Sequence, residues 1–200
     1  MKPTLMRTYT GRLVDPWKVL DEDLDVLDIA HALAHQCRYG GHVARHYSVA
    51  EHSVLLARHF LAIGATGPTE FGRRLARWAL LHDAAETFLP DLPAPIKRRL
   101  PQYSEASHAI DVVICRRFGV DAPASTRHVV DTADKAIVED EMRALMARPY
   151  QRGNGLDVTV HGWPALKARD EFLALGAELG LWINEWKPSS PAAAASLEAA

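Results

Sequence analysis

Apolar residues recur with the period of an α-helix along most of this chain, and glycine or proline interrupts the pattern at intervals. Ser48 and Glu51 have the spacing of a capping box, so we expect a helix to begin there. Asp28 is a candidate cap for an earlier helix, which Gly40 and Gly41 would end. The pattern predicts helices over residues 28–38, 48–63, 68–86, 103–118, 125–147 and 164–179. We therefore expect an all-α fold.

Two short segments depart from the helical pattern. Residues 8–14 and 156–160 carry β-branched side chains in partial alternation, so we expect them to pair as a minor two-stranded β ribbon. Four prolines fall within residues 90–101, and proline has no amide hydrogen to give a helix interior. A rigid loop is therefore predicted directly after the helix over residues 68–86.

The composition indicates one globular domain, because 48% of the 200 residues are hydrophobic. We expect that domain to span residues 1–187, with a disordered Pro-, Ser- and Ala-rich tail over 188–200. A net charge of -2 without a basic stripe argues against nucleic-acid binding, and no apolar run is long enough to span a membrane. Two cysteines do not make a disulfide framework, and residues 1–15 do not resemble a secretory leader. A cytoplasmic location is therefore expected.

Histidines and aspartates in three predicted helices have the residue types of a metal site. His82 and Asp83 end a strongly apolar stretch, where polar groups need a partner because burying them unpaired is costly. His52 lies in the preceding helix and Asp134 in a later one, so the three helices can converge on one ion. Imidazole and carboxylate suit Zn, Mn, Fe, Co or Ni. Each residue alone has a simpler reading, as a core, surface or ion-paired side chain, and only the combination is specific.

Three stretches of the chain resemble the HD-domain phosphohydrolase superfamily, in particular its 5'-deoxynucleotidase branch. They are YSVAEHS over residues 47–53, LLHDAAETFLPDLPAPIK over 80–97 and TADK over 132–135. The resemblance implies a bundle of about six helices. It also implies one divalent transition metal, with Mg as a further candidate, a nucleotide substrate, and a homo-oligomer that is a dimer or larger. The metal ligands it implies are His52, His82, Asp83 and Asp134.

Two carboxylates near the predicted ligands are candidate catalytic groups. Glu86 follows His82 by four residues and Asp83 by three, which would place all three on one helical face. A carboxylate there can take a proton from an attacking water, and the resemblance makes Glu86 the catalytic glutamate. Asp91 lies in the proline-rich loop, and the resemblance implies that it contacts substrate and assists proton transfer. The alternatives are an exposed helix end for Glu86 and a turn residue for Asp91.

Four further residues are candidate substrate contacts. Lys97 can meet a phosphate oxygen as a point charge, and it can equally well be solvated. Arg38 and Tyr39 resemble an Arg-Trp pair that contacts phosphate and sugar in the similar nucleotidases, with tyrosine in place of tryptophan. His46 is close enough in sequence to His52 to touch phosphate, which would suit a di- or triphosphate.

Several functions remain open at this stage. The favoured one releases phosphate from nucleoside 5'-monophosphates, and its alternative releases triphosphate from a deoxynucleoside triphosphate such as dATP. A third reading is a catalytically inactive HD fold that acts as a binding module. A second-messenger phosphodiesterase is disfavoured, because no second set of catalytic metal ligands is recognisable. His31 and His35 have metal-compatible spacing, but no carboxylate motif accompanies them or His42.

Overall fold

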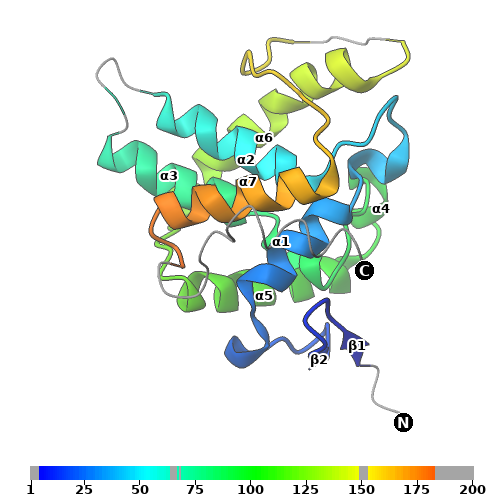
Figure 1. Ribbon diagram of the computed structural model, residues 1–200, viewed down its shortest axis with the longest axis vertical. Coiled ribbons are helices and arrows are strands. Elements are labelled where there is room, and N and C mark those ends of the chain that lie inside the picture. Colours follow the sequence, from blue (N-terminus) through cyan, green and yellow to red (C-terminus); the bar gives the residue numbers. More distant parts are fainter. Residues whose placement is uncertain (1–4, 64–66, 68, 149–152, 183–200) are drawn as a thin grey trace, which may run out of the picture.

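The computed structural model describes residues 5–63, 67, 69–148 and 153–182, so the tail predicted over 188–200 lies outside the described residues. The described part is a helical bundle with one small ribbon, which confirms the all-α prediction (Figure 1). Its α-helices are α1 (Val26–His35), α2 (Val49–Leu61), α3 (Glu70–Leu81), α4 (Ala94–Lys97), α5 (Pro101–Arg117), α6 (Ala124–Leu145) and α7 (Ala165–Glu178). Three 3-10 helices complete it: η1 (Asp21–Asp23), η2 (Arg38–Gly41) and η3 (Ala84–Thr87). None of the helices in these ranges is long and apolar enough to cross a membrane.

Helix α2 is the central element, with α1, α3, α6 and α7 packed around it. Ten of its 13 residues are buried, as expected of a helix surrounded by other helices. Helix α7 crosses both α1 and α2 on one face of the molecule (Figure 1). Because α2 carries His52, the first candidate ligand lies in the core rather than at the surface.

The helix boundaries differ from the sequence prediction at several places, and the short helix α4 lies within the predicted proline-rich loop. Helix α1 is capped by Asp25, whose carboxylate accepts from the Leu27 amide. The predicted cap, Asp28, instead accepts from the backbone amide and hydroxyl of Thr10 at 2.6 and 2.7 Å. The helix predicted over 68–86 ends at Leu81, and the chain then turns into η3.

The β ribbon is present but its predicted pairing is wrong. Strand β2 (Leu13–Val14) ends the first predicted segment and pairs antiparallel with β1 (Met6–Arg7), which directly precedes that segment, whereas residues 156–160 form no strand. Their amides have another acceptor, because the Asp140 carboxylate of α6 accepts from the Leu156 amide at 2.7 Å and the Val158 amide at 3.4 Å. A buried carboxylate thus takes the hydrogen bonds that a partner strand would have taken.

Replacing Asp140 with alanine is expected to lower the free energy of unfolding by about 1–3 kcal/mol, because it leaves two half-buried amides without their acceptor. The change should appear as a lower midpoint in urea, with Asp131→Ala as the control on an exposed position of the same helix. Equal midpoints for the two variants would show that Asp140 does not hold the segment after α6.

Candidate metal centre

Four side chains from three elements meet in the middle of the bundle. His52 comes from α2, His82 caps the C-terminal end of α3 with Asp83 directly after it, and Asp134 comes from α6. His52 Nε2 lies 3.1 Å from Asp134 Oδ1 and 3.9 Å from Asp83 Oδ2. His82 Nε2 lies 3.3 Å from Asp83 Oδ2 and 3.9 Å from Asp134 Oδ1. The structure therefore brings together all four residues that the sequence selected as ligands.

The two imidazole side chains each have a nitrogen atom that a metal ion could bind. The Nε2 atoms of His52 and His82 are both buried, and neither has a hydrogen-bond partner among the described residues. Unpartnered buried polar atoms are rare in proteins. One ligand atom each from His52, His82 and Asp134 lies within 4.8 Å of the others, so this group can hold a metal ion. Two imidazoles and two carboxylates are a suitable donor set for a divalent transition metal.

The shifted pKa values of the cluster residues show that its carboxylates favour positive charge beside them. Burial disfavours a charged imidazole at His82, but Asp83 and Asp134 outweigh it and raise the pKa of His82 to about 10. Burial likewise disfavours a charged Asp134, yet His52 and His82 lower the pKa of Asp134 to about 2. Because metal ions compete with protons for such ligands, a divalent cation can supply the compensation that these two carboxylates need.

A cavity of about 510 Å³ adjoins the ligand cluster. Asp83 and Asp134 form part of its wall, and the candidate catalytic and substrate-contact residues Glu86, Asp91, Arg38, Tyr39 and Lys97 line the rest of it with Arg98 and Lys135 among others. A cavity of this size is typical of small-molecule sites. Seven of the predicted ligand, catalytic and contact residues therefore line one cavity, and the two imidazoles lie beside Asp83 and Asp134 of its wall.

Glu86 reaches this cavity by a route that the helical spacing did not predict. The helix ends before it, and η3 carries the side chain into the buried part of the wall. Lys97 donates to Glu86 Oε1 at 2.6 Å, whereas Glu86 Oε2 is buried without a hydrogen-bond partner among the described residues. Burial and the nearby Asp83 raise the pKa of Glu86 to about 8, although Lys97 acts in the opposite direction.

Lys97 lines the cavity and forms ion pairs with two carboxylates of its wall, and its contact with a phosphate stays a prediction. Besides Glu86, its ammonium lies 3.5 Å from Asp91 Oδ1. Gln36 fixes the same loop from the other side, because its side-chain amide donates to the Glu86 carbonyl and accepts from the Asp91 amide. Gln36 was not among the predicted residues, and a lone glutamine at the end of a helix gives no sequence signal for this role.

Arg38 and Tyr39 lie at the cavity wall in η2. Arg38 is within 3.4 Å of Asp83 and 3.5 Å of Glu141, both at the long end of hydrogen-bond distances. Tyr39 has a left-handed backbone with φ 59°, a conformation that costs a non-glycine residue energy, and its hydroxyl donates to Glu141. Both predicted contacts thus lead to Glu141, which the sequence reasoning missed.

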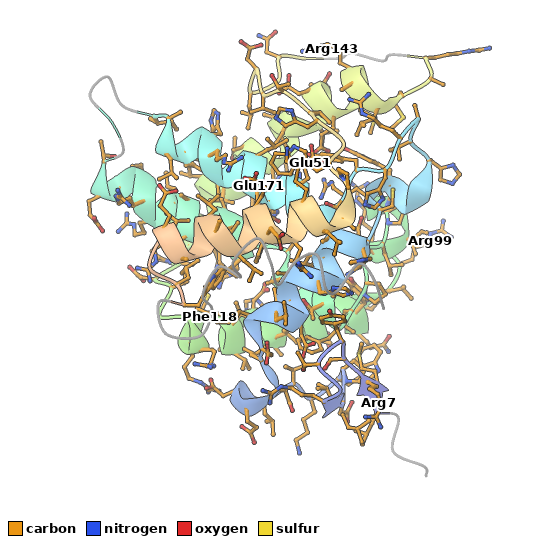
Figure 2. The ribbon with its side chains drawn as sticks, in the orientation of Figure 1. Arg7, Glu51, Arg99, Phe118, Arg143 and Glu171 are labelled. Carbon is orange, nitrogen blue, oxygen red and sulfur yellow. The ribbon has the colours of Figure 1, made fainter. Side chains whose placement is uncertain are left out.

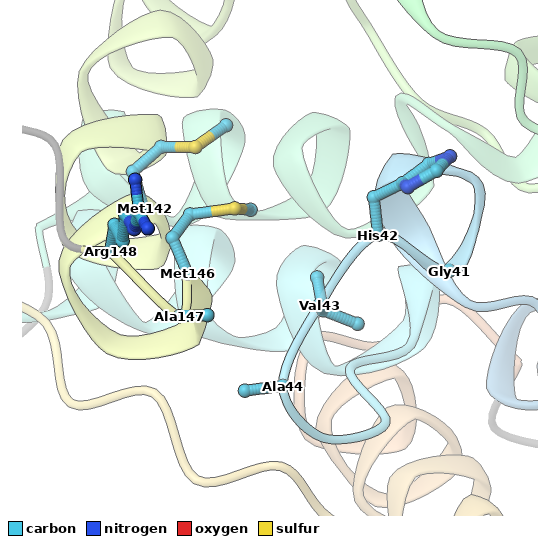
Figure 3. Close-up of a pocket in the computed structure, with 8 residues that line it drawn as sticks. All are labelled: Gly41, His42, Val43, Ala44, Met142, Met146, Ala147 and Arg148. Carbon is cyan, nitrogen blue, oxygen red and sulfur yellow. The ribbon is translucent and has the colours of Figure 1, made fainter.

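The remaining histidines lie away from the ligand cluster. His46 is exposed, its ring faces the Ala34 carbonyl at 3.3 Å, and it is not part of the cavity wall. His31 and His35 stack on each other with Tyr9 above them, and no metal-binding group is found there among the described residues. His42 lines a second, largely apolar hollow, opposite Met142 of α6 and Met146, which directly follows that helix (Figure 3).

Two curated proteins match this chain over most of its length. YfdR of Escherichia coli (strain K12) is 36% identical over 194 residues, which cover 94% of this chain and 96% of YfdR. The chain belongs to the YfdR family. RCAP_rcc00048 of Rhodobacter capsulatus is 34% identical over 139 residues, covering 67% of this chain and 69% of that protein. Both relatives carry the description "uncharacterized protein", and no family model matches the chain.

Glu141 is the buried carboxylate at the centre of this YfdR-family site. It is fully buried and accepts from His52 Nδ1 at 2.7 Å and from the Tyr47 hydroxyl at 2.8 Å. Burial opposes its ionisation, but Arg38 and His52 outweigh burial and lower the pKa of Glu141 to about 2. A sequence signal did exist, because Glu141 follows Asp134 by seven residues, which is two helical turns on one face.

Proposed function

We propose that this chain is a divalent-metal-dependent phosphohydrolase of nucleotides. One observation carries the proposal: two buried imidazole nitrogens, without hydrogen-bond partners among the described residues, lie beside two carboxylates of a cavity wall that also contains Glu86. The HD-domain resemblance supplies the phosphate chemistry and the nucleotide, and the ligand geometry is compatible with it. A cytoplasmic, homo-oligomeric protein belongs to the same proposal.

The residues that would hold the metal are His52, His82, Asp83 and Asp134. When bound, a divalent ion would polarise a phosphoryl oxygen and lower the pKa of a water molecule. Both imidazoles present Nε2 toward the two carboxylates, so the side chains already have the direction needed to share one cation, which would displace any proton on these nitrogens. The fixed positions of these ligands come from three helices of the core.

Glu86 is the group in this cavity that can receive a proton. Its Oε1 is held by Lys97, so Oε2 has a fixed position and free lone pairs. In its ionised form, Oε2 can align a water for attack on phosphorus and accept its proton. The leaving oxygen would take a proton from Asp91, which lies 3.5 Å from Lys97 on the cavity wall, or from solvent.

Basic residues of the cavity wall would stabilise the charge that develops on the phosphoryl group. Arg38 can contribute because its contacts to Asp83 and Glu141 are long. Arg98 and Lys135 also line the cavity, and no ion pair is found for either among the described residues. These two cations give specific support to the second candidate, a deoxynucleoside triphosphate triphosphohydrolase, because a longer phosphate chain carries more charge to neutralise.

A hydrolysis screen of nucleoside mono- and triphosphates with Mn²⁺, Co²⁺, Zn²⁺, Ni²⁺, Fe²⁺ and Mg²⁺ tests the proposal. Release of inorganic phosphate from monophosphates supports a nucleotidase, and release of intact triphosphate supports the second candidate. Binding of nucleotide without turnover under every metal would instead favour an inactive binding module. Omission of metal, with a chelator present, is the control for contaminating phosphatase.

Replacing Lys97 with methionine is expected to shift the acidic limb of the pH–rate profile to higher pH. Lys97 lowers the pKa of Glu86, so its removal raises that pKa and the ionised form appears only at higher pH. Loss of an adjacent opposite charge typically moves a pKa by about 1–3 units. Lys97→Arg keeps the charge and should keep the limb near its original position. An unmoved limb in Lys97→Met would contradict ionised Glu86 as the proton acceptor.

A further inference from the structure

We infer that Glu141 is a positioning residue that fixes the tautomer of His52 and ties this ligand to Arg38 and Tyr39, so that it sets the affinity of the metal site. The inference concerns the same site as the proposed function. It requires that the site binds a metal, and it does not require that nucleotides are hydrolysed.

The contacts of Glu141 divide between its two carboxylate oxygens. Oε1 accepts from His52 Nδ1 at 2.7 Å and from the Tyr47 hydroxyl at 2.8 Å. Oε2 accepts from the Tyr39 hydroxyl and lies 3.5 Å from Arg38 Nη2. The side chain is 0% exposed. Four donors thus converge on one buried carboxylate, which makes the network costly to disturb at any one point.

The bond to Nδ1 determines which nitrogen of His52 faces the candidate centre. An ionised carboxylate only accepts hydrogen bonds, so Nδ1 must carry a proton, and Nε2 is then the ring nitrogen that can offer a lone pair to a metal ion. That lone pair belongs to the atom 3.1 Å from Asp134 Oδ1. Histidine ligands of metals generally donate their other N–H to such an acceptor, and loss of the acceptor typically weakens metal binding by about 10–100-fold.

Through Oε2, Glu141 also contacts two residues of the cavity wall. Tyr39 holds a left-handed backbone at φ 59°, and its hydroxyl bond to Glu141 helps to retain that strained turn. Arg38 lies directly before it and bridges Glu141 to Asp83, itself a candidate ligand. Glu141 therefore contacts one candidate ligand, His52, directly and a second, Asp83, through Arg38.

The chain offers a matched control in Glu51. It is also a fully buried glutamate, and it directly precedes His52 on α2 (labelled in Figure 2). Its carboxylate accepts from the backbone amides of His161, Gly162 and Trp163 at 2.6–2.9 Å, and within the described part of the chain it has no hydrogen bond or ion pair to the four candidate ligands. A general effect of neutralising a buried glutamate should appear equally at both positions, whereas positioning of His52 should appear only at Glu141.

The experiment measures Mn²⁺ and Co²⁺ binding to the metal-free full chain by titration calorimetry, for wild type, Glu141→Gln and Glu51→Gln. Glutamine offers one acceptor oxygen where Glu141 serves four donors. We expect Glu141→Gln to weaken binding by about 10–100-fold and to change the visible spectrum of bound Co²⁺. Glu51→Gln should keep the affinity and spectrum of wild type. Wild-type binding in Glu141→Gln, or equal weakening in both variants, would overturn the inference.

A measurement on the wild-type chain decides the matter if Glu141→Gln fails to fold. Imidazole ¹⁵N chemical shifts, assigned with His52→Gln, should show a proton on Nδ1 and none on Nε2 of His52 in the Zn²⁺-bound protein. A proton on Nε2 would contradict the role of Glu141. A chain that binds metal as expected and hydrolyses no nucleotide would refute the proposed function alone.

Discussion

Replacing Asp134 with alanine is expected to abolish hydrolysis and stoichiometric metal binding together. Asp134 supplies the oxygen nearest to His52 Nε2, and its loss leaves two buried imidazoles with one carboxylate partner. Loss of an outer-shell residue already costs about 10–100-fold in affinity or activity, so removal of a direct ligand should exceed 100-fold. Metal content by mass spectrometry and turnover with the preferred nucleotide are the two measurements.

The control for Asp134→Ala is Asp131→Ala, which removes an exposed carboxylate from the same helix one turn earlier. It should retain metal and activity. A thermal scan with and without added metal separates a folding defect from a binding defect, because an ion that binds only the folded state raises the melting temperature. Full metal occupancy in Asp134→Ala would contradict its assignment as a ligand.

Replacing Glu86 with glutamine is expected to lower turnover by about 10²–10⁴-fold while metal binding is retained. The amide cannot accept a proton at neutral pH, although it keeps the shape of the side chain and can still contact Lys97. Glu105→Gln, at an exposed position of α5, is the matched control and should keep wild-type turnover. Undiminished hydrolysis in Glu86→Gln with its metal present would remove Glu86 from the mechanism and leave Asp91 as the candidate proton acceptor.

These two variants separate the two parts of the proposal. Asp134→Ala tests whether the cluster is a metal site, and Glu86→Gln tests whether the site performs hydrolysis. If Glu86→Gln keeps the metal and loses turnover, its nucleotide affinity can be measured without conversion of the ligand. That affinity, compared between mono- and triphosphates, then addresses the choice between the two candidate reactions.

The helices were predictable from the sequence because their apolar period, caps and breakers agree. Helix α6, for instance, was predicted over 125–147 and is found at Ala124–Leu145. The ribbon pairing was not predictable, because alternation in residues 156–160 does not say whether a strand or a side chain accepts their amide bonds. Only the folded chain places the Asp140 carboxylate there.

The candidate site was also predictable only in part. Ligand types and spacing pointed to His52, His82, Asp83 and Asp134, and the fold brings them to one place. Lys97 was predicted as a phosphate contact, whereas in the structure it contacts Glu86 and Asp91, which no spacing rule reveals. His46 is near in sequence to His52 but exposed, since sequence distance along a loop does not fix direction.

The three amide bonds of Glu51 have a consequence for how the molecule can unfold. They attach the segment before α7 to the residue that directly precedes His52. If that segment detached, the Glu51 carboxylate in the core would lose these three backbone donors, which is costly. Partial opening of the C-terminal part should therefore disturb α2 at the position of His52. In hydrogen exchange, the amides of residues 161–163 and those around His52 should then exchange as one cooperative unit.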